Sequence, residues 1–536
     1  MRALRLVALA TVTLTADCRT PVPLYDDLGS FTHRISSRVP EAQRYFDQGL
    51  RLTYAFNHAE AVRAFDEAAR RDDRCAICWW GVALAWGPNI NIPMDSAGEA
   101  AAWAAIQEAR RRAAHASEPE RAYIEALAAR HGVPAGADRA RRDSTYATAM
   151  RSVRDRFAGD PDAAVLYADA MMNLRPWNYW QPDGSPYPGT EDILATLEGA
   201  VGSDSTHPGA CHFYIHAVEK VQPERAVACA ERLARLMPGA GHLVHMPAHI
   251  YFRVGRYGDA VAANEHASHA DSVYLEGQRP GGGLYPLFYT PHNHHFRSAA
   301  AAMEGRFAAA LDAARQTARL TPIDNVRAVP PAELYVPVPL YVLARFGRWD
   351  DILRETAPPA ELRFTTGIWR YARGLAFAAT GRADSARREA AALDSIVAAT
   401  PAEAIIGLNS GRTLLEIASH ALAGEIAARA RLFGDAVRHL DAAIRLEDGL
   451  TYDEPPPWYF PVRHALGAVW LAADRPRDAE AVYREDLRRY PENGWSLIGL
   501  RNALRAQRQW AAADSADARF RQAWARADAP ITASRL

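Results

Sequence analysis

The sequence predicts an all-α protein built as a solenoid of stacked helix hairpins. The first observation is a recurring unit in which a tight turn precedes an alanine, followed in several copies by a proline twelve residues later. The second is the spacing of apolar residues at i, i+3, i+4 and i+7 on both sides of that turn, which is typical of amphipathic helices. The third is that no alternating, strand-like pattern competes with it. Stacking is expected because one helix pair cannot bury its apolar face alone.

The unit occurs eight times along the chain. Clear copies are GRYGDAVAANEHA, GRFAAALDAA and RPRDAEAVYREDLRRYP. A small alanine after the turn lets two helices approach closely, and the proline after the second helix ends that helix. The eight anchoring alanines are Ala61, Ala226, Ala260, Ala310, Ala386, Ala436, Ala479 and Ala513.

This pattern resembles the tetratricopeptide repeat, an antiparallel helix pair of about 34 residues. The resemblance extends over most of residues 40–530. It implies a right-handed superhelix of helix hairpins with a concave groove that binds ligands. Three stretches, HPGACHFYIHAVE, GHLVHMPAHIYFRVGRY and HNHHF, are similar to a His-rich subgroup of exported bacterial tetratricopeptide proteins, in which asparagine often stands at the position of Cys211. The resemblance implies a fold and names no activity.

Irregular spacing of the units divides the chain. Ala226 and Ala260 are 34 residues apart, whereas Ala61 and Ala226 are 165 residues apart. We expect N-terminal tetratricopeptide-like helices, a central His-rich region and C-terminal tetratricopeptide-like helices, over residues 24–140, 141–325 and 326–536. Four inserts combine proline, glycine and aromatic residues, which predicts ordered loops rather than linkers. The inserts are residues 86–94, 174–192, 276–291 and 450–461.

The N-terminus has the features of an export signal. Two arginines precede a short apolar stretch, which is typical of a signal peptide over residues 1–17. LTADC resembles a lipobox and predicts lipidation of Cys18, although Asp17 replaces the usual small residue; cleavage near Ala16 is the alternative. We therefore expect an exported protein, either periplasmic or an outer-membrane-anchored lipoprotein, that contacts a membrane only through its N-terminal lipid.

Composition and motifs exclude several function classes. The 536 residues carry a formal net charge of −1, so no overall field attracts nucleic acid, and we expect no nucleic-acid partner. The chain has no P-loop, H-E-x-x-H or G-x-S-x-G motif. Beyond Cys18, four cysteines remain, which permits disulfides in an exported protein. CAIC at 75–78 predicts a local disulfide or two packed thiols rather than a redox site, because no βαβ pattern surrounds it.

Histidines are concentrated in one part of the chain, with eleven of 18 between residues 207 and 295. His212 and His216 form an H-x-x-x-H pair, and His245 and His249 form another about one repeat later. Residues i, i+3, i+4 and i+7 share one face of a helix, so each pair belongs to a stripe on the first helix of its hairpin. The tetratricopeptide resemblance implies that this face lines the groove.

We expect imidazoles of neighbouring hairpins to converge on a metal ion. Packed helices lie about 8–10 Å apart, and two imidazoles can bridge that gap at Zn–N distances of about 2.0–2.1 Å. Clustered neutral imidazoles suit Zn, Cu, Fe or Ni, whose identity the sequence leaves open. The candidate ligands are His212, His216, His245 and His249. The candidates for further ligands or outer-shell partners are Glu219, His242, His292 and His295.

Three functions compete for these residues. The first is an exported helical-repeat protein with a His-rich transition-metal site in its groove. The second is a metal-free scaffold that binds a peptide or protein partner there. The third is a metal-dependent hydrolase or oxidoreductase with Glu219 as acid–base, so whether the chain is an enzyme stays open. Structural hydrogen bonding of the histidines is the remaining alternative. Pro247 either begins or kinks the helix between His245 and His249.

Overall fold

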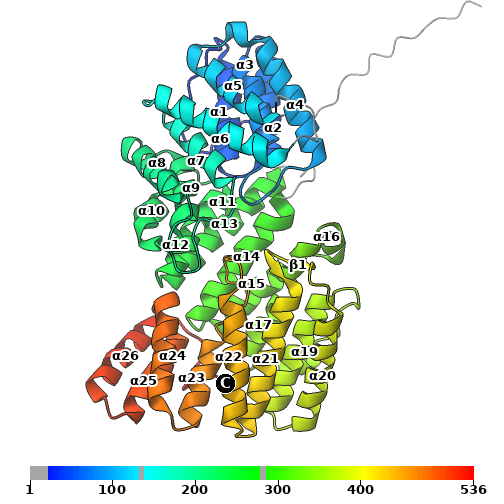
Figure 1. Cartoon of the computed structure of the whole chain (residues 1–536), viewed down its shortest axis with the longest axis vertical. Coiled ribbons are helices and arrows are strands. Elements are labelled where there is room, and N and C mark those ends of the chain that lie inside the picture. Colours follow the sequence, from blue (N-terminus) through cyan, green and yellow to red (C-terminus); the bar gives the residue numbers. More distant parts are fainter. Residues whose placement is uncertain (1–21, 132–137, 278–284) are drawn as a thin grey trace, which may run out of the picture.

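The computed structural model describes residues 22–131, 138–277 and 285–536, and it confirms the all-α hairpin solenoid. Successive helices pack side by side in hairpins that stack along the chain (Figure 1). The strands in the described part are β1 (Ile405–Ile406) and β2 (Asn409–Ser410), an antiparallel pair with Ile405 opposite Ser410. Within the same residues, none of the helices combines the length and apolar character that a membrane crossing requires. The expected signal segment and Cys18 lie outside the described residues.

The N-terminal half, drawn from blue to green in Figure 1, holds the first helices and two 3-10 turns. They are α1 (Pro40–Tyr54), α2 (His58–Arg71), α3 (Ala76–Ala85), α4 (Ser96–Arg111), η1 (Ala113–His115), α5 (Glu118–His131), α6 (Arg139–Arg156), α7 (Pro161–Met172), α8 (Thr190–Ser203), α9 (Pro208–Val218), η2 (Pro223–Ala226), α10 (Val227–Leu236), α11 (Gly241–His245), α12 (Pro247–Arg253) and α13 (Tyr257–Gly277).

The C-terminal half, drawn from green to red, is more regular. Its helices are α14 (Tyr285–Met303), α15 (Phe307–Arg319), α16 (Ile323–Ala328), η3 (Pro330–Tyr335), α17 (Val338–Arg345), α18 (Trp349–Arg354), α19 (Arg363–Ala379), α20 (Ala383–Ala399), α21 (Gly411–Arg429), α22 (Phe433–Asp448), α23 (Arg463–Ala472), α24 (Pro476–Arg489), α25 (Gly494–Ala506) and α26 (Trp510–Ala523). Helix α14 joins the halves, because its Tyr289 packs in the first hydrophobic core and its Phe296 in the second.

The anchoring alanines occupy one structural position. In seven hairpins the alanine is the fourth residue of the second helix, as Ala61 is in α2 and Ala260 is in α13. The eighth, Ala226, ends η2 immediately before α10. All eight are 0% exposed. A methyl side chain at this point allows the close helix contact that the repeat pattern predicts.

The turn before that helix also repeats. One residue near its start has a left-handed backbone, for example Gly255 with φ of 80° and Gly305 with φ of 78°. Glycine adopts this conformation without a steric penalty. In the α1–α2 turn the residue is Phe56, with φ of 57°. A bulky side chain there is an outlier, and such strain is common beside functional sites.

One sequence prediction is corrected at α14, and an open alternative is decided at α12. The insert 276–291 was expected to be a loop, but residues 285–291 belong to α14, with Pro291 inside the helix. Buried Tyr285 and Tyr289 pack in the core and hold this first part of α14 against it. Pro247 begins α12 after α11 has ended at His245, so the helix is interrupted between the two histidines of the second pair. Residues 281–283, a glycine run, lie outside the described residues.

Candidate metal centre

Six histidines from four helices form one cluster in the described part of the chain. Helix α9 carries His212 and His216, and the short helices α11 and α12 carry the next three. Pro208 opens α9, and a disulfide between Cys211 and Cys229 ties α9 to α10 beside the cluster. The remaining members of the cluster are His242, His245, His249 and, from α14, His292.

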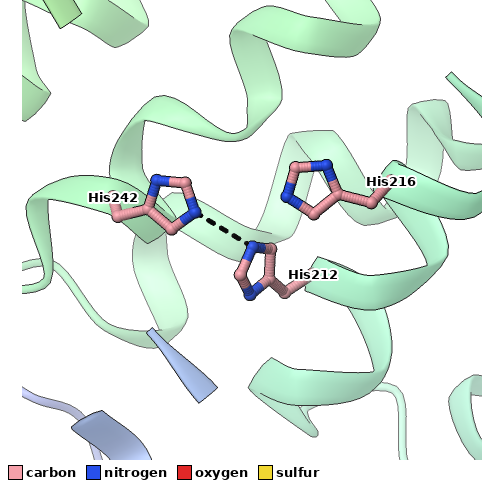
Figure 2. A group of neighbouring side chains, drawn as sticks. All are labelled: His212, His216 and His242. Atoms are coloured by element: carbon pink, nitrogen blue, oxygen red, sulfur yellow. Dashed lines mark hydrogen bonds between the residues drawn. The ribbon is translucent and has the colours of Figure 1, made fainter. Parts of the chain in front are cut away.

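The first trio comprises His212, His216 and His242. Figure 2 shows each ring turning one nitrogen toward the other two. His242 Nε2 lies 3.2 Å from His212 Nε2. One ring nitrogen from each of the three lies within 4.8 Å of the others. Two nitrogens bound at about 2.0–2.1 Å to a tetrahedral ion are themselves about 3.3 Å apart, so the trio is spaced as a ligand set would be.

The second trio comprises His245, His249 and His292. His245 Nε2 lies 2.8 Å from His249 Nε2 and 3.1 Å from His292 Nε2. One ligand atom from each ring again lies within 4.8 Å of the others. The interruption at Pro247 places His245 and His249 on separate short helices, yet their rings still meet.

Hydrogen bonds at Nδ1 orient four of these rings. His212 Nδ1 donates to the carbonyl of Tyr54 at 2.6 Å. His245 Nδ1 donates to Asn264 Oδ1 at 2.7 Å, and the amide orientation follows because Asn264 Nδ2 donates to the Ala260 carbonyl. Carbonyl oxygens only accept, so in both rings the proton is on Nδ1 and Nε2 presents a lone pair.

Glu219 orients the other two. Its Oε1 accepts from His216 Nδ1 at 3.0 Å, and its Oε2 accepts from His249 Nδ1 at 2.5 Å. Burial alone would raise the pKa of this carboxyl, but His249 and His216 hold the pKa at about 2. The ionised carboxylate therefore fixes the Nδ1–H tautomer in both rings, which is the arrangement that commonly orients metal-binding histidines.

Burial keeps most rings neutral. Desolvation, reinforced by neighbouring imidazoles, lowers the pKa of His212, His242, His245 and His292 well below the usual value. Burial also lowers the pKa of His249, but the Glu219 charge outweighs it and raises that pKa overall. Neutral imidazole is the form that binds metals.

Hydrogen bonding alone does not satisfy the cluster. His245 has one Nε2 lone pair, yet two imidazoles approach it, and only one of them can donate a hydrogen to it. Among the described residues, the buried atoms His216 Nε2 and His242 Nδ1 have no hydrogen-bond partner. Buried polar atoms without partners are rare in folded proteins. A cation between the Nε2 atoms would satisfy the inward lone pairs together.

Aromatic side chains close the cluster. The Phe56 ring lies 4.5 Å from His212 and 5.5 Å from His242 between centroids, and Trp177 lies 5.0 Å from His216. On the other side, Phe296 lies 5.1 Å from His245 and 5.0 Å from His249. Five of the six rings are at most 3% exposed. The expectation that the histidines line an open groove is therefore corrected, because the α1–α2 turn, the 174–189 loop and α14 cover them.

The remaining sequence candidates take other positions. Glu219 contacts the Nδ1 atoms of His216 and His249, and its carboxylate also forms a possible ligand group with these two rings. His295 is buried outside both trios, with its ring 5.6 Å from Tyr335 and 6.4 Å from Tyr459. His242 and His292, expected as secondary, complete the trios.

Several contributing residues were missed by sequence reasoning. Asn264 lies four residues after Ala260, and a polar residue on that buried stripe was the available signal. Phe56 stands where several other hairpin turns have glycine, which was a second signal. Tyr54 acts through its backbone carbonyl, and a backbone contact leaves no trace in residue type.

Comparisons with known proteins assign no function to this cluster. No family model matches the chain, and no curated protein matches it in sequence. A solved structure of the human IFIT1 dimer with m7Gppp-AAAA is similar at 12% identity and a TM-score of 0.33, covering 91% of this chain and 90% of that one. Yeast Tom70 is similar at 10% identity and a TM-score of 0.29, covering 90% of each chain. At this level of similarity, neither protein's ligands transfer to this chain.

Proposed function

We propose that this helical-repeat protein binds transition-metal ions through the two histidine trios. The observation that carries the proposal is the direction of the Nε2 atoms. In His212, His216, His245 and His249 the Nδ1 hydrogen is already donated, and Nε2 is the nitrogen left to face the other rings of the cluster. His245 Nε2 and His249 Nε2 lie 2.8 Å apart, so without a metal one of them carries the hydrogen between them; a metal ion in place of that hydrogen would bind both nitrogens.

The surroundings support a metal site rather than a structural cluster. The Nδ1 partners are a carboxylate, an amide oxygen and a backbone carbonyl, the groups that orient metal-bound imidazoles and raise their basicity. Protons compete weakly for the four rings whose pKa is well below the usual value, so these ligands are ready at neutral pH.

We also propose that the protein is exported, on the signal-like pattern of residues 1–17 and on the lipobox-like LTADC. Disulfides Cys75–Cys78 and Cys211–Cys229 support an oxidising compartment.

A metal-dependent enzyme is the second candidate function. Three protein ligands on one ion leave a coordination position free, which catalytic sites keep and structural sites fill. A peptide partner is less compatible with this site, because Phe56, Trp177 and Phe296 close it.

Elemental analysis tests the metal-binding proposal. The full chain, produced without a His tag, should carry stoichiometric transition metal. The double variant His245→Gln/His249→Gln should lose it. The matched control is His420→Gln/His439→Gln, which removes another contacting pair, with its Nδ1 atoms 3.1 Å apart on the half-exposed α21–α22 hairpin. No metal in any preparation, and none after incubation with Zn, Cu, Fe or Ni salts, would overturn the proposal.

A further inference from the structure

The two trios are built alike and lie next to each other. Each brings together three imidazole ligand atoms within 4.8 Å. Across the boundary between the trios, ring centroids are 5.5 Å apart for His216 and His249, and 5.9 Å apart for His242 and His245. Six rings around one ion would exceed what a tetrahedral metal accepts, whereas three rings around each of two ions leave both with one free position.

One carboxylate connects the trios. Glu219, 0% exposed, accepts from His216 of the first trio through Oε1 and from His249 of the second through Oε2. A single side chain therefore fixes the orientation of one ligand in each set. This shared anchor connects the two trios in one unit.

The ligand set favours copper. The six donors of the two trios are imidazole nitrogens, which suit zinc, copper, iron and nickel, and among these divalent ions copper(II) is bound most strongly. The site is also buried and flanked by Phe56 and Phe296, so low total charge is favoured. Two copper(I) ions introduce two positive charges, whereas two zinc ions introduce four, against the ionised Glu219.

We propose that the trios hold a pair of copper ions whose free positions share one small ligand, either an anion or a neutral molecule of two or three atoms. This inference rests on the proposed metal binding and adds the number of ions, their identity and the class of ligand. A small ligand is the kind that suits a buried site, because five of the six rings are at most 3% exposed.

Copper stoichiometry tests the pair. The full chain is loaded with copper(I) without oxygen, desalted and analysed for copper per chain, with equimolar zinc as competitor. We expect two copper ions per chain in the wild type, and one in each of His242→Gln and His292→Gln, which truncate different trios. His295→Gln, which changes a buried histidine outside the trios, should keep both. A variant that retains one copper is folded at the other trio, which separates ligand loss from misfolding.

Electron paramagnetic resonance tests the shared ligand, with azide as the probe. Wild-type protein loaded with copper(II) and azide should lose most of its signal, because two copper ions bridged by one ligand couple magnetically. Each single-trio variant should show the signal of one isolated copper(II).

The outcomes separate this inference from the proposed function. One copper per wild-type chain, lost in both variants, would overturn the pair and leave metal binding intact. Two uncoupled signals in azide would overturn the shared ligand. Two zinc ions retained against copper would overturn the choice of metal. Absence of every metal would overturn both proposals.

Discussion

Buried histidines occur in both halves of the molecule, but their ring nitrogens are used differently. In the C-terminal half, His464 on α23 is 2% exposed; its Nε2 donates to Asp486 at 2.8 Å and its Nδ1 accepts from Arg345 at 2.9 Å. In the central cluster, Nδ1 is paired in four of the six rings, and several Nε2 atoms face other imidazoles. Burial is therefore shared by both groups, and the contact of one imidazole nitrogen with another distinguishes the proposed ligands.

The hairpin turns of the two halves also differ, in the residue that takes the left-handed position. Turns of the C-terminal half place exposed or flexible residues, such as Gly381 and Arg431, in the left-handed position. The α1–α2 turn places buried Phe56 there, and its ring covers the first trio. In the C-terminal half the left-handed turn only connects the two helices of a hairpin. In the N-terminal half the same turn geometry also places Phe56 over the candidate site.

The largest expected effect is on the structural side of this comparison. Asp486 is 0% exposed and accepts from His464, Ser496 and Asn493. Asp486→Ala should lower the free energy of unfolding by about 3–5 kcal/mol, because it leaves buried polar partners unpaired. Denaturant unfolding measures this loss, and elemental analysis should show unchanged metal content. Metal loss in the folded variant would contradict the separation of the two kinds of histidine.

The second effect is on the ligand side. Glu219→Gln keeps the size of the side chain, but its amide NH2 group faces one of the two Nδ1–H donors. Metal affinity should fall by about 10–100-fold, as for other outer-shell substitutions. Competition with a chelator measures it. The control is Glu389→Gln, which changes a buried carboxylate paired with Arg370 and Arg373 far along the solenoid. Equal metal affinity in both variants would show that Glu219 does not contribute to metal binding.

Repetition made the hairpins predictable, because each anchoring alanine has the same local task and the same spacing from its turn. The register of the histidines was predictable for the same reason: His245 lies 15 residues before Ala260, as His295 lies 15 before Ala310. Register does not decide where a ring turns, and His295 packs against Tyr335 while His292 reaches His245. The segments that cover the histidine cluster were not predictable, because they are distant in sequence: Tyr54 contacts His212 across 158 residues.

A third change tests the strained turn. Phe56→Gly relieves the left-handed strain but removes a buried ring, so we expect a net loss of about 2 kcal/mol in unfolding free energy. Uncovering the first trio should also speed metal release to a chelator several-fold, measured by stopped-flow absorbance. Arg431→Gly makes the same backbone change at an exposed turn with φ of 61° and should leave metal release unchanged. Equal release rates in both variants would show that Phe56 does not close the site.

The smallest effect concerns His33, a histidine of the N-terminal half that pairs with a carboxylate instead of a ring. Its Nδ1 lies 2.7 Å from Asp162 Oδ2. Burial lowers the pKa of His33, but the hydrogen bond and charge of Asp162 outweigh it and raise the pKa from 6.5 to about 9. The folded pKa exceeds the unfolded one, so this stability is complete below pH 6.5 and is lost as the pH rises through 9.

The full shift corresponds to about 3 kcal/mol, but water screens the partly exposed His33 side chain, so we expect the wild type to lose about 1–2 kcal/mol of unfolding free energy between pH 6 and pH 9.5 through this pair. Urea unfolding at the two pH values measures the loss, and His33→Gln should reduce it by that amount. His115→Gln changes an exposed histidine and serves as the control. If the pH dependence of His33→Gln equals that of the wild type, Asp162 does not hold His33 in its charged form. His33 would then be neutral, like the five clustered rings whose pKa is lowered, and its contact with Asp162 would be an ordinary hydrogen bond rather than an ion pair.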